Sequence, residues 1–173
     1  PRTEKRVIIA SAVAKGQRFD WMVSKCTELG VDCIVPLIFE RSVKQASGDS
    51  VLERYKKLVI AAAKQCGRVH LPEIFLPVKL LDLDKLLQKY CPNAIILLGG
   101  LGEQTLLFTK AANCKGDLVS VIGPEGGMTP AEEENLIKIG AVRVTITDTV
   151  LRTETASLAF ASILCALRDS LDM

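Results

Sequence analysis

The sequence lacks the features that mark membrane-spanning, secreted and metal-binding chains. No uninterrupted apolar run reaches the roughly 20 residues that a membrane helix needs, and no basic-then-apolar segment typical of a secretion signal opens the chain. The 173 residues include one histidine and six cysteines, with no C-x-x-C pair, so neither a zinc site nor a disulfide framework is expected. We therefore predict a cytoplasmic protein with reduced thiols, no metal and no membrane partner.

Phosphate-binding fingerprints are absent as well. Neither G-x-x-x-x-G-K-[ST] nor G-x-G-x-x-G occurs, so a nucleotide-binding Rossmann domain ranks last among the candidate functions. The formal net charge is +2 and the pI is about 8.4, a mildly basic balance that is compatible with an RNA partner.

Apolar runs typical of buried strands alternate with segments of helical periodicity along the chain. With 173 residues, of which 49% are hydrophobic, one globular domain covering 1–173 is expected. This alternation predicts an α/β fold, a mostly parallel sheet with helices on both faces. Strands are expected at 6–13, 33–39, 72–76, 94–98, 118–122 and 141–146, and helices at 19–29, 51–66, 83–90, from 129 and at 155–167.

A glycine-rich stretch, VIGPEGGMTPAE at 121–132, links a predicted strand to a predicted helix. Thr129, Pro130 and Glu132 form a capping box with proline at the first helical position. The preceding glycines allow the backbone to approach a ligand closely. Glu125 would repel phosphate, so the loop suits an uncharged or cationic ligand. A tight turn without any ligand is the alternative, and on this loop alone the two readings are even.

Two other clusters carry polar side chains near predicted helix ends. The first is LRTETA at 151–156, whose polar residues favour a binding site. The alternative is that Thr155 caps the following helix and that Arg152 and Glu154 form a solvated ion pair. In KCTELGV at 25–31 and ERS at 40–42, the alternatives are ordinary surface charge and a helix that ends at Gly30. Because ligands bind beyond the carboxyl ends of parallel strands, neighbouring loops at that edge favour a site.

Taken together, the motifs resemble the RsmE family of bacterial ribosomal RNA methyltransferases, which act on N3 of a uridine in the small subunit. KCTELGV with ERSV, AAKQCGR at 62–68, IGPEGGMTPAE and LRTETA occur in the family's order, and the resemblance runs from about 6 to 167. It implies a SPOUT-type fold with a C-terminal trefoil knot, a homodimer, and ribosomal RNA or the small ribosomal subunit as partner. The family's N-terminal PUA-like domain is expected to be absent from this chain, which begins with Pro1.

The resemblance also implies a cleft for the cofactor S-adenosylmethionine, which carries a sulfonium cation and no phosphate. Its expected binding residues come from three loops: Leu98, Gly99 and Gly100; Ile122, Gly123, Pro124, Glu125, Gly126 and Gly127; Leu151, Arg152, Thr153, Thr155 and Ala156.

The expected catalytic residues are Arg152, to stabilise charge on a uracil carbonyl oxygen, and Glu154, either to accept the N3 proton or to orient Arg152. Arg41 and Arg68 are expected to contact RNA phosphates. Two alternatives stay open: a SPOUT methyltransferase for another RNA atom, such as a ribose 2′-hydroxyl, and a non-catalytic RNA-binding module of the same fold. The pairing of KCTELGV with LRTETA favours the uridine enzyme over the first, and the intact glycine loops favour it over the second.

Overall fold

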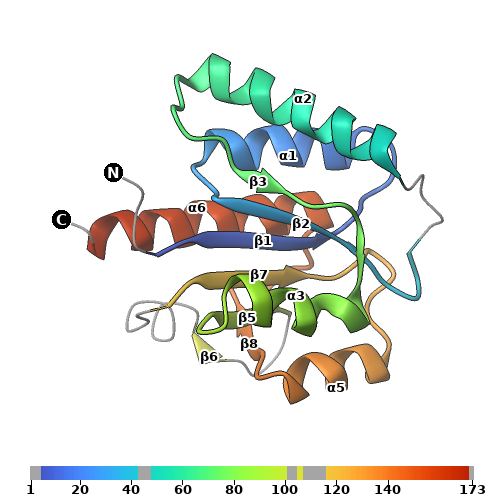
Figure 1. Ribbon diagram of the computed structural model, residues 1–173. Helices are drawn as coiled ribbons and strands as arrows, with labels where there is room; N and C mark the ends of the chain where they lie inside the picture. Colours follow the sequence, from blue (N-terminus) through green and yellow to red (C-terminus); the bar gives the residue numbers. More distant parts are fainter. Residues whose placement is uncertain (1–4, 43–47, 101–104, 107–115, 172–173) are drawn as a thin grey trace.

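A parallel sheet forms the centre of the molecule. The computed structural model describes residues 5–42, 48–100, 105–106 and 116–171 (Figure 1). The strand order is β3-β2-β1-β7-β5-β8-β6, with β4 also paired to β2, and each of these pairings is parallel. The strands are β1 (Val7–Ala12), β2 (Cys33–Ile38), β3 (Glu73–Ile74), β4 (Val78–Lys79), β5 (Ile95–Gly99), β6 (Thr105–Leu106), β7 (Leu118–Ile122) and β8 (Val142–Thr145).

Helices cover both faces of this sheet, which confirms the predicted α/β layering (Figure 1). Side chains alternate along β1, so Ile9 joins one apolar cluster and Ile8 the other. The first cluster includes Phe19, Tyr55 and Phe160 from three helices, and the second includes helical residues such as Leu83 and Leu136. Helices α1 (Arg18–Glu28), α2 (Asp49–Cys66) and α6 (Thr153–Leu171) supply the first cluster; the 3₁₀ helix η1 (Leu80–Asp82), α3 (Leu83–Tyr90) and α5 (Pro130–Lys138) supply the second.

The capping box of α5 is formed as predicted. The Thr129 backbone N–H donates to Glu132 Oε2 at 2.8 Å, and the Glu132 N–H donates to Thr129 Oγ1 at 3.3 Å. The second carboxylate oxygen of Glu132 accepts from the Glu40 N–H at 2.7 Å. One buried carboxylate therefore fixes the start of α5 and also ties it to the loop that follows β2.

Helix α6 begins at Thr153 and not at 155 as predicted, so the alternative in which Thr155 caps the helix is wrong. The first turn closes when the Ala156 N–H donates to the Arg152 carbonyl at 2.8 Å, and the Ser157 hydroxyl donates to the Thr153 carbonyl at 2.8 Å. Thr153 and Glu154 are consequently helical and buried, whereas Thr155 is exposed. This shift matters because it places two residues of the LRTETA motif inside the protein.

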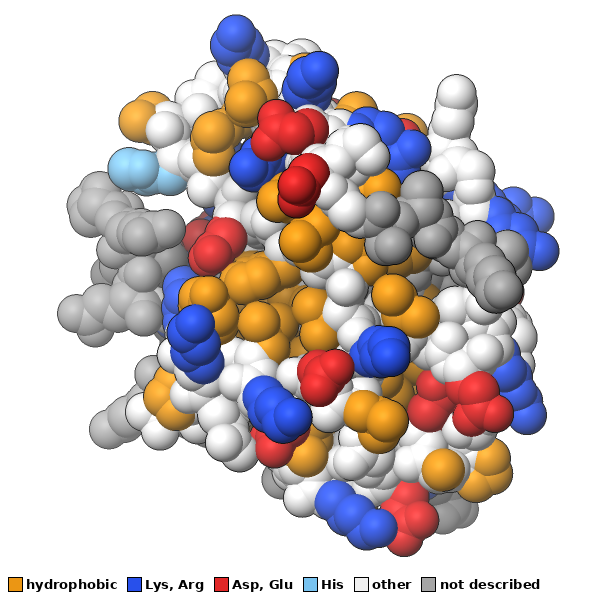
Figure 2. Space-filling model, turned by 45° about the vertical axis from the view of Figure 1, so that its right-hand side comes forward, with side chains coloured by type: hydrophobic (Ala, Val, Ile, Leu, Met, Phe, Trp, Pro, Cys, Tyr) orange, Lys and Arg blue, Asp and Glu red, His pale blue; other side chains and the backbone are white. Residues whose placement is uncertain are grey.

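The trefoil knot stays a prediction, because the connection from β5 to β7 passes through 101–104 and 107–115, outside the described residues. In the part of the chain that the structure covers, no helix is long and apolar enough to cross a membrane. Figure 2 shows one face of the molecule, where hydrophobic side chains gather in the middle and charged side chains of both signs surround them.

Candidate functional site

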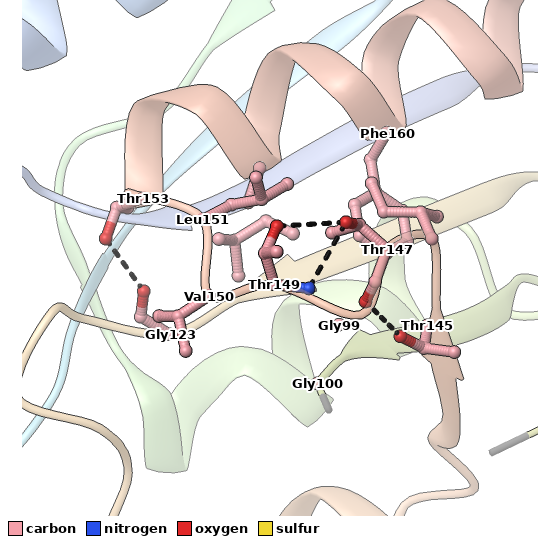
Figure 3. A pocket seen from close by; sticks show the side chains of 13 residues that line it. Gly99, Gly100, Gly123, Thr145, Thr147, Thr149, Val150, Leu151, Thr153 and Phe160 are labelled. Carbon is pink, nitrogen blue, oxygen red and sulfur yellow. Dashed lines mark hydrogen bonds between the residues drawn. The ribbon is translucent and has the colours of Figure 1, made fainter. Parts of the chain in front are cut away.

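Three neighbouring strands, β7, β5 and β8, end at one edge of the sheet beside a cavity of about 150 Å³ that is open at its mouth (Figure 3). We call it the first cavity. It is lined by Gly99, Gly100, Ile122, Gly123, Thr145, Ile146, Thr147, Thr149, Val150, Leu151, Thr153, Ala156 and Phe160.

Glycine backbone forms one wall of the first cavity. A Cβ atom on Gly99 would lie 3.0 Å from Cε2 of Phe160 and 3.3 Å from Cδ1 of Ile122, so a side chain there would displace the packing behind the wall. A Cβ on Gly100 would meet nothing within 4 Å, which leaves that backbone open to a ligand. Since no described lining side chain is charged, the wall suits an uncharged or partly apolar ligand that approaches the backbone closely.

Threonine hydroxyls form another part of the rim. Thr145 Oγ1 donates to the Thr147 carbonyl at 3.0 Å, and the hydroxyls of Thr147 and Thr149 lie 3.0 Å apart (Figure 3). The Thr149 N–H also donates to Thr147 Oγ1 at 3.3 Å, so this loop is held by its own hydrogen bonds. Sequence reasoning missed the lining residues Thr145, Ile146, Thr147, Thr149, Val150 and Phe160. A signal for the loop was present, because TITDTV directly follows a strand that ends at the same edge.

The expected cofactor residues divide into separate groups. Those lining the first cavity are Gly99, Gly100, Ile122, Gly123, Leu151, Thr153 and Ala156. Leu98 is buried in the core cluster that faces α3 and α5. Gly127 has a φ of 71° and donates its N–H to the Pro124 carbonyl at 2.9 Å, which closes a tight turn. Arg152 and Thr155 are exposed.

Pro124, Glu125 and Gly126 of the GPEGG loop line a second cavity of about 210 Å³, again open to solvent. Thr153 lines both cavities, and its hydroxyl donates to the Gly123 carbonyl at 3.1 Å. The Arg41 guanidinium donates to the Gly126 carbonyl at 3.1 Å. The second cavity is lined by Ala12, Val13, Ala14, Lys15, Arg41, Ser42, Pro124, Glu125, Gly126 and Thr153. The loop after β7 thus stands between two cavities of different chemistry.

Glu154 is a buried titratable group at this edge, with 7% of its surface exposed. Its Oε1 lies 3.7 Å from the Arg18 guanidinium, which also bonds to the Glu125 carboxylate. Its Oε2 is buried and has no hydrogen-bond partner among the described residues. No described contact joins Glu154 to Arg152. The cation that pairs with Glu154 is Arg18. Sequence reasoning missed Arg18, for which the sequence carries no local signal.

Arg68 lies at the opposite edge of the sheet. Its guanidinium donates to the Thr27 carbonyl at 3.0 Å and to the Gly30 carbonyl at 3.2 Å, and it lies 3.7 Å from Asp32. Asp32 immediately precedes β2 and also accepts the Val7 N–H at the start of β1, at 2.9 Å. Since the strands are parallel, this cluster marks their amino ends, away from both cavities. Arg68 therefore bonds to the end of α1, and of the two arginines expected to contact RNA phosphates, Arg41 is the one that lies at the site.

Comparisons with known proteins agree with this geometry. A model of the RNA methyltransferase domain family matches residues 1–165. Over 165 residues the chain is 32% identical to ribosomal RNA small subunit methyltransferase E of Bacillus subtilis, covering 88% of this chain and 62% of that protein. The chain thus spans less than two thirds of that curated relative.

Solved structures show the same fold. The structure of ribosomal RNA small subunit methyltransferase E from Neisseria gonorrhoeae, bound to S-adenosyl methionine, is 29% identical with a TM-score of 0.84, covering 96% of this chain and 68% of that one. A TrmH/SpoU tRNA modifying enzyme from Aquifex aeolicus has 14% identity and a TM-score of 0.61, covering 99% of this chain and 78% of that one, which shows a shared fold. The family match over most of the chain confirms the resemblance carried by the motifs: this chain belongs to the RNA methyltransferase domain family, with small subunit methyltransferase E among its relatives.

Proposed function

We propose that the chain uses S-adenosylmethionine to methylate N3 of a uridine in small-subunit ribosomal RNA. The observation that carries this proposal is the first cavity, whose glycine wall and uncharged lining suit a ligand without phosphate. The family match supports the reaction class, and the cofactor bound to the relative from Neisseria gonorrhoeae supports the choice of ligand.

The residues of the first cavity fit this cofactor. Gly99 and Gly100 would give it backbone to lie against, and Leu151 and Phe160 would give the adenine ring apolar contact. The rim threonines offer hydroxyl groups to the polar edges of the ligand. Bound there, S-adenosylmethionine supplies an electrophilic methyl group on a sulfonium, which leaves as a neutral thioether when the methyl group is transferred.

Glu154 is the proposed proton acceptor for the uridine. N3 carries a proton that must be lost when the new N–C bond forms, and a carboxylate oxygen within hydrogen-bond reach can take it. The unpartnered Oε2 of Glu154 is available for this bond, and Arg18 balances the carboxylate charge from the other side. Exposed Arg152, two residues before Glu154 in the chain, is the proposed donor to a uracil carbonyl oxygen.

The proposed homodimer rests on the family resemblance alone. Apolar side chains of α6, including Phe160, Ala161 and Leu164, are buried within this chain, where the helix packs on β1, β7 and α1. Most of the hydrophobic character of α6 is therefore explained by packing inside one subunit.

Calorimetric titration with S-adenosylmethionine tests the cofactor site, using a matched pair of glycine variants. Gly100→Val places an isopropyl group in the first cavity without striking a neighbour, and the φ of Gly100 is not positive. We expect it to weaken binding at least about tenfold, since the ligand must give up backbone contact. Gly126→Val, whose side chain enters the second cavity, is the control and should keep the affinity of the unmodified chain. No binding by the unmodified chain, or equal binding by Gly100→Val, would contradict the proposal.

The methylated atom is identified by digesting the RNA product to nucleosides. Incubation of small-subunit ribosomal RNA with the chain and S-adenosylmethionine should yield 3-methyluridine in mass spectrometry against a standard. A ribose-methylated nucleoside would instead support the 2′-hydroxyl alternative.

A further inference from the structure

The second cavity has no part in the cofactor site described above, yet the two cavities adjoin. Thr153 lines both, and its hydrogen bond to the Gly123 carbonyl holds β7 to the start of α6 at their junction. Methyl transfer requires donor and acceptor atoms within about 3–3.5 Å of each other. An acceptor for a cofactor in the first cavity must therefore lie directly beside it, as the second cavity does.

The charges of the two cavities differ. Within the part of the chain that the structure describes, no lining side chain of the first cavity is charged, whereas Lys15 and Arg41 line the second. Glu125, the acidic residue among the described lining residues of the second cavity, is paired with Arg18. Two cations remain to face a ligand, and a guanidinium and an ammonium both bind phosphate oxygens well.

A second feature points to a ligand that donates a hydrogen bond. Two ion pairs link Glu125 to Arg18 and Arg18 to Glu154. They run from the surface inward, since the exposed fractions of these three side chains are 48%, 33% and 9%. The innermost carboxylate keeps one buried oxygen without a partner among the described residues. A buried acceptor without a donor is costly, so a bound N–H group would relieve it.

We infer that the second cavity is the subsite for the acceptor pyrimidine nucleotide of the RNA. Its phosphates contact Lys15 and Arg41, and its base lies toward Thr153, with the N–H edge directed at Glu154. This inference rests on the proposed function, because it names where that reaction's RNA substrate binds. It assigns the GPEGG loop two roles: Gly123 faces the cofactor, whereas Pro124, Glu125 and Gly126 face the RNA.

The test measures binding of a short oligouridylate that carries one 4-thiouridine, in the presence of S-adenosylhomocysteine so that no methyl group is transferred. A Cβ on Gly126 would have only Arg41 Cβ within 4 Å, at 3.9 Å, so Gly126→Val fills the cavity without disturbing the fold. We expect this variant to weaken oligonucleotide binding at least about tenfold. Gly100→Val is the control and is titrated without any cofactor. Its affinity for the oligonucleotide should equal that of the unmodified chain titrated in the same way.

Photo-crosslinking then locates the base. Light-induced cross-links should fall within 12–15, 41–42, 124–126 and 153–154, as read by mass spectrometry of the peptides. The inference is overturned if the unmodified chain does not bind the oligonucleotide, if Gly126→Val binds it equally well, or if the cross-links fall only in other segments. Failure of the proposed function would instead appear as absent cofactor binding, which is measured separately.

Discussion

The side chains of Arg41 and Arg68 lie in different environments, although both residues belong to motifs of the family. Arg68 is half-buried, and its guanidinium satisfies carbonyl oxygens at the end of α1. Burial lowers its pKa, and nearby Asp32 opposes that shift. Arg41 is exposed at the second cavity, where its single described bond is to the Gly126 carbonyl. One arginine therefore belongs to the stability of the fold and the other to the site.

Substitution by alanine separates these two roles. Arg68→Ala removes one donor each from the Thr27 carbonyl, the Gly30 carbonyl and Asp32, all of which keep another donor, so we expect a loss of about 1 kcal/mol in the free energy of unfolding, measured by urea titration. Arg41→Ala should change that free energy by less than about 0.5 kcal/mol. It should instead weaken oligouridylate binding and lower the salt slope of the affinity by about one. If Arg68→Ala bound RNA more weakly while its free energy of unfolding stayed unchanged, Arg68 would be a residue that contacts RNA.

At the scale of elements, the start of α5 connects the GPEGG loop to the rest of the sheet edge. Glu132 accepts one bond from its own cap residue and another from the Glu40 N–H, beside Arg41. The loop that contributes Arg41 and the loop that contributes glycine backbone to the second cavity are thus joined by a single carboxylate.

Removal of the cap should be measurable. Thr129→Ala deletes the hydroxyl that accepts the Glu132 N–H, and we expect it to lower the free energy of unfolding by about 1 kcal/mol. Thr129→Ser keeps the hydroxyl and is the matched control, expected to stay close to the unmodified chain. Equal stability of the alanine and serine variants in urea would show that the hydroxyl bond contributes nothing.

At the scale of the whole molecule, charges of both signs are spread over the face in Figure 2, and the formal net charge is only +2. Such a surface produces no strong general attraction for RNA. Affinity for a nucleotide must therefore come from local groups such as Lys15 and Arg41.

The cysteines report on global unfolding, since the fold buries most of them. Burial raises the pKa of Cys26, Cys33 and Cys91, and that of Cys165 to about 12, whereas Cys66 at the end of α2 is exposed. Because the thiolate is the reactive form, we expect iodoacetamide to modify Cys66 in the native protein and the buried thiols only in urea. Mass spectrometry of the peptides measures each site; Cys114 lies outside the described residues. Rapid native labelling of Cys26 would reveal local opening between α1 and α6.

Much of the local structure was predictable from the sequence. The helix at 83–90 and the strand at 118–122 have the predicted bounds, and the capping box at Thr129 was recognised from three residues. Short-range sterics and hydrogen bonds decide these features, so a window of a few residues contains the information. The motifs also identified the family, because their order along the chain is itself a property of the sequence.

The composition of the site was decided by the tertiary structure. Arg18 and Glu125 are 107 positions apart, and Thr153 lies 30 positions from the carbonyl it binds, so no local pattern could pair them. The same holds for the division of the GPEGG loop between two cavities and for Arg68 at the far edge. The sequence by itself determined which segments form strands, helices and glycine turns. The order of the parallel strands decided which of their ends meet, because hydrogen bonding between distant strands, and not neighbourhood in the chain, brings those loops together.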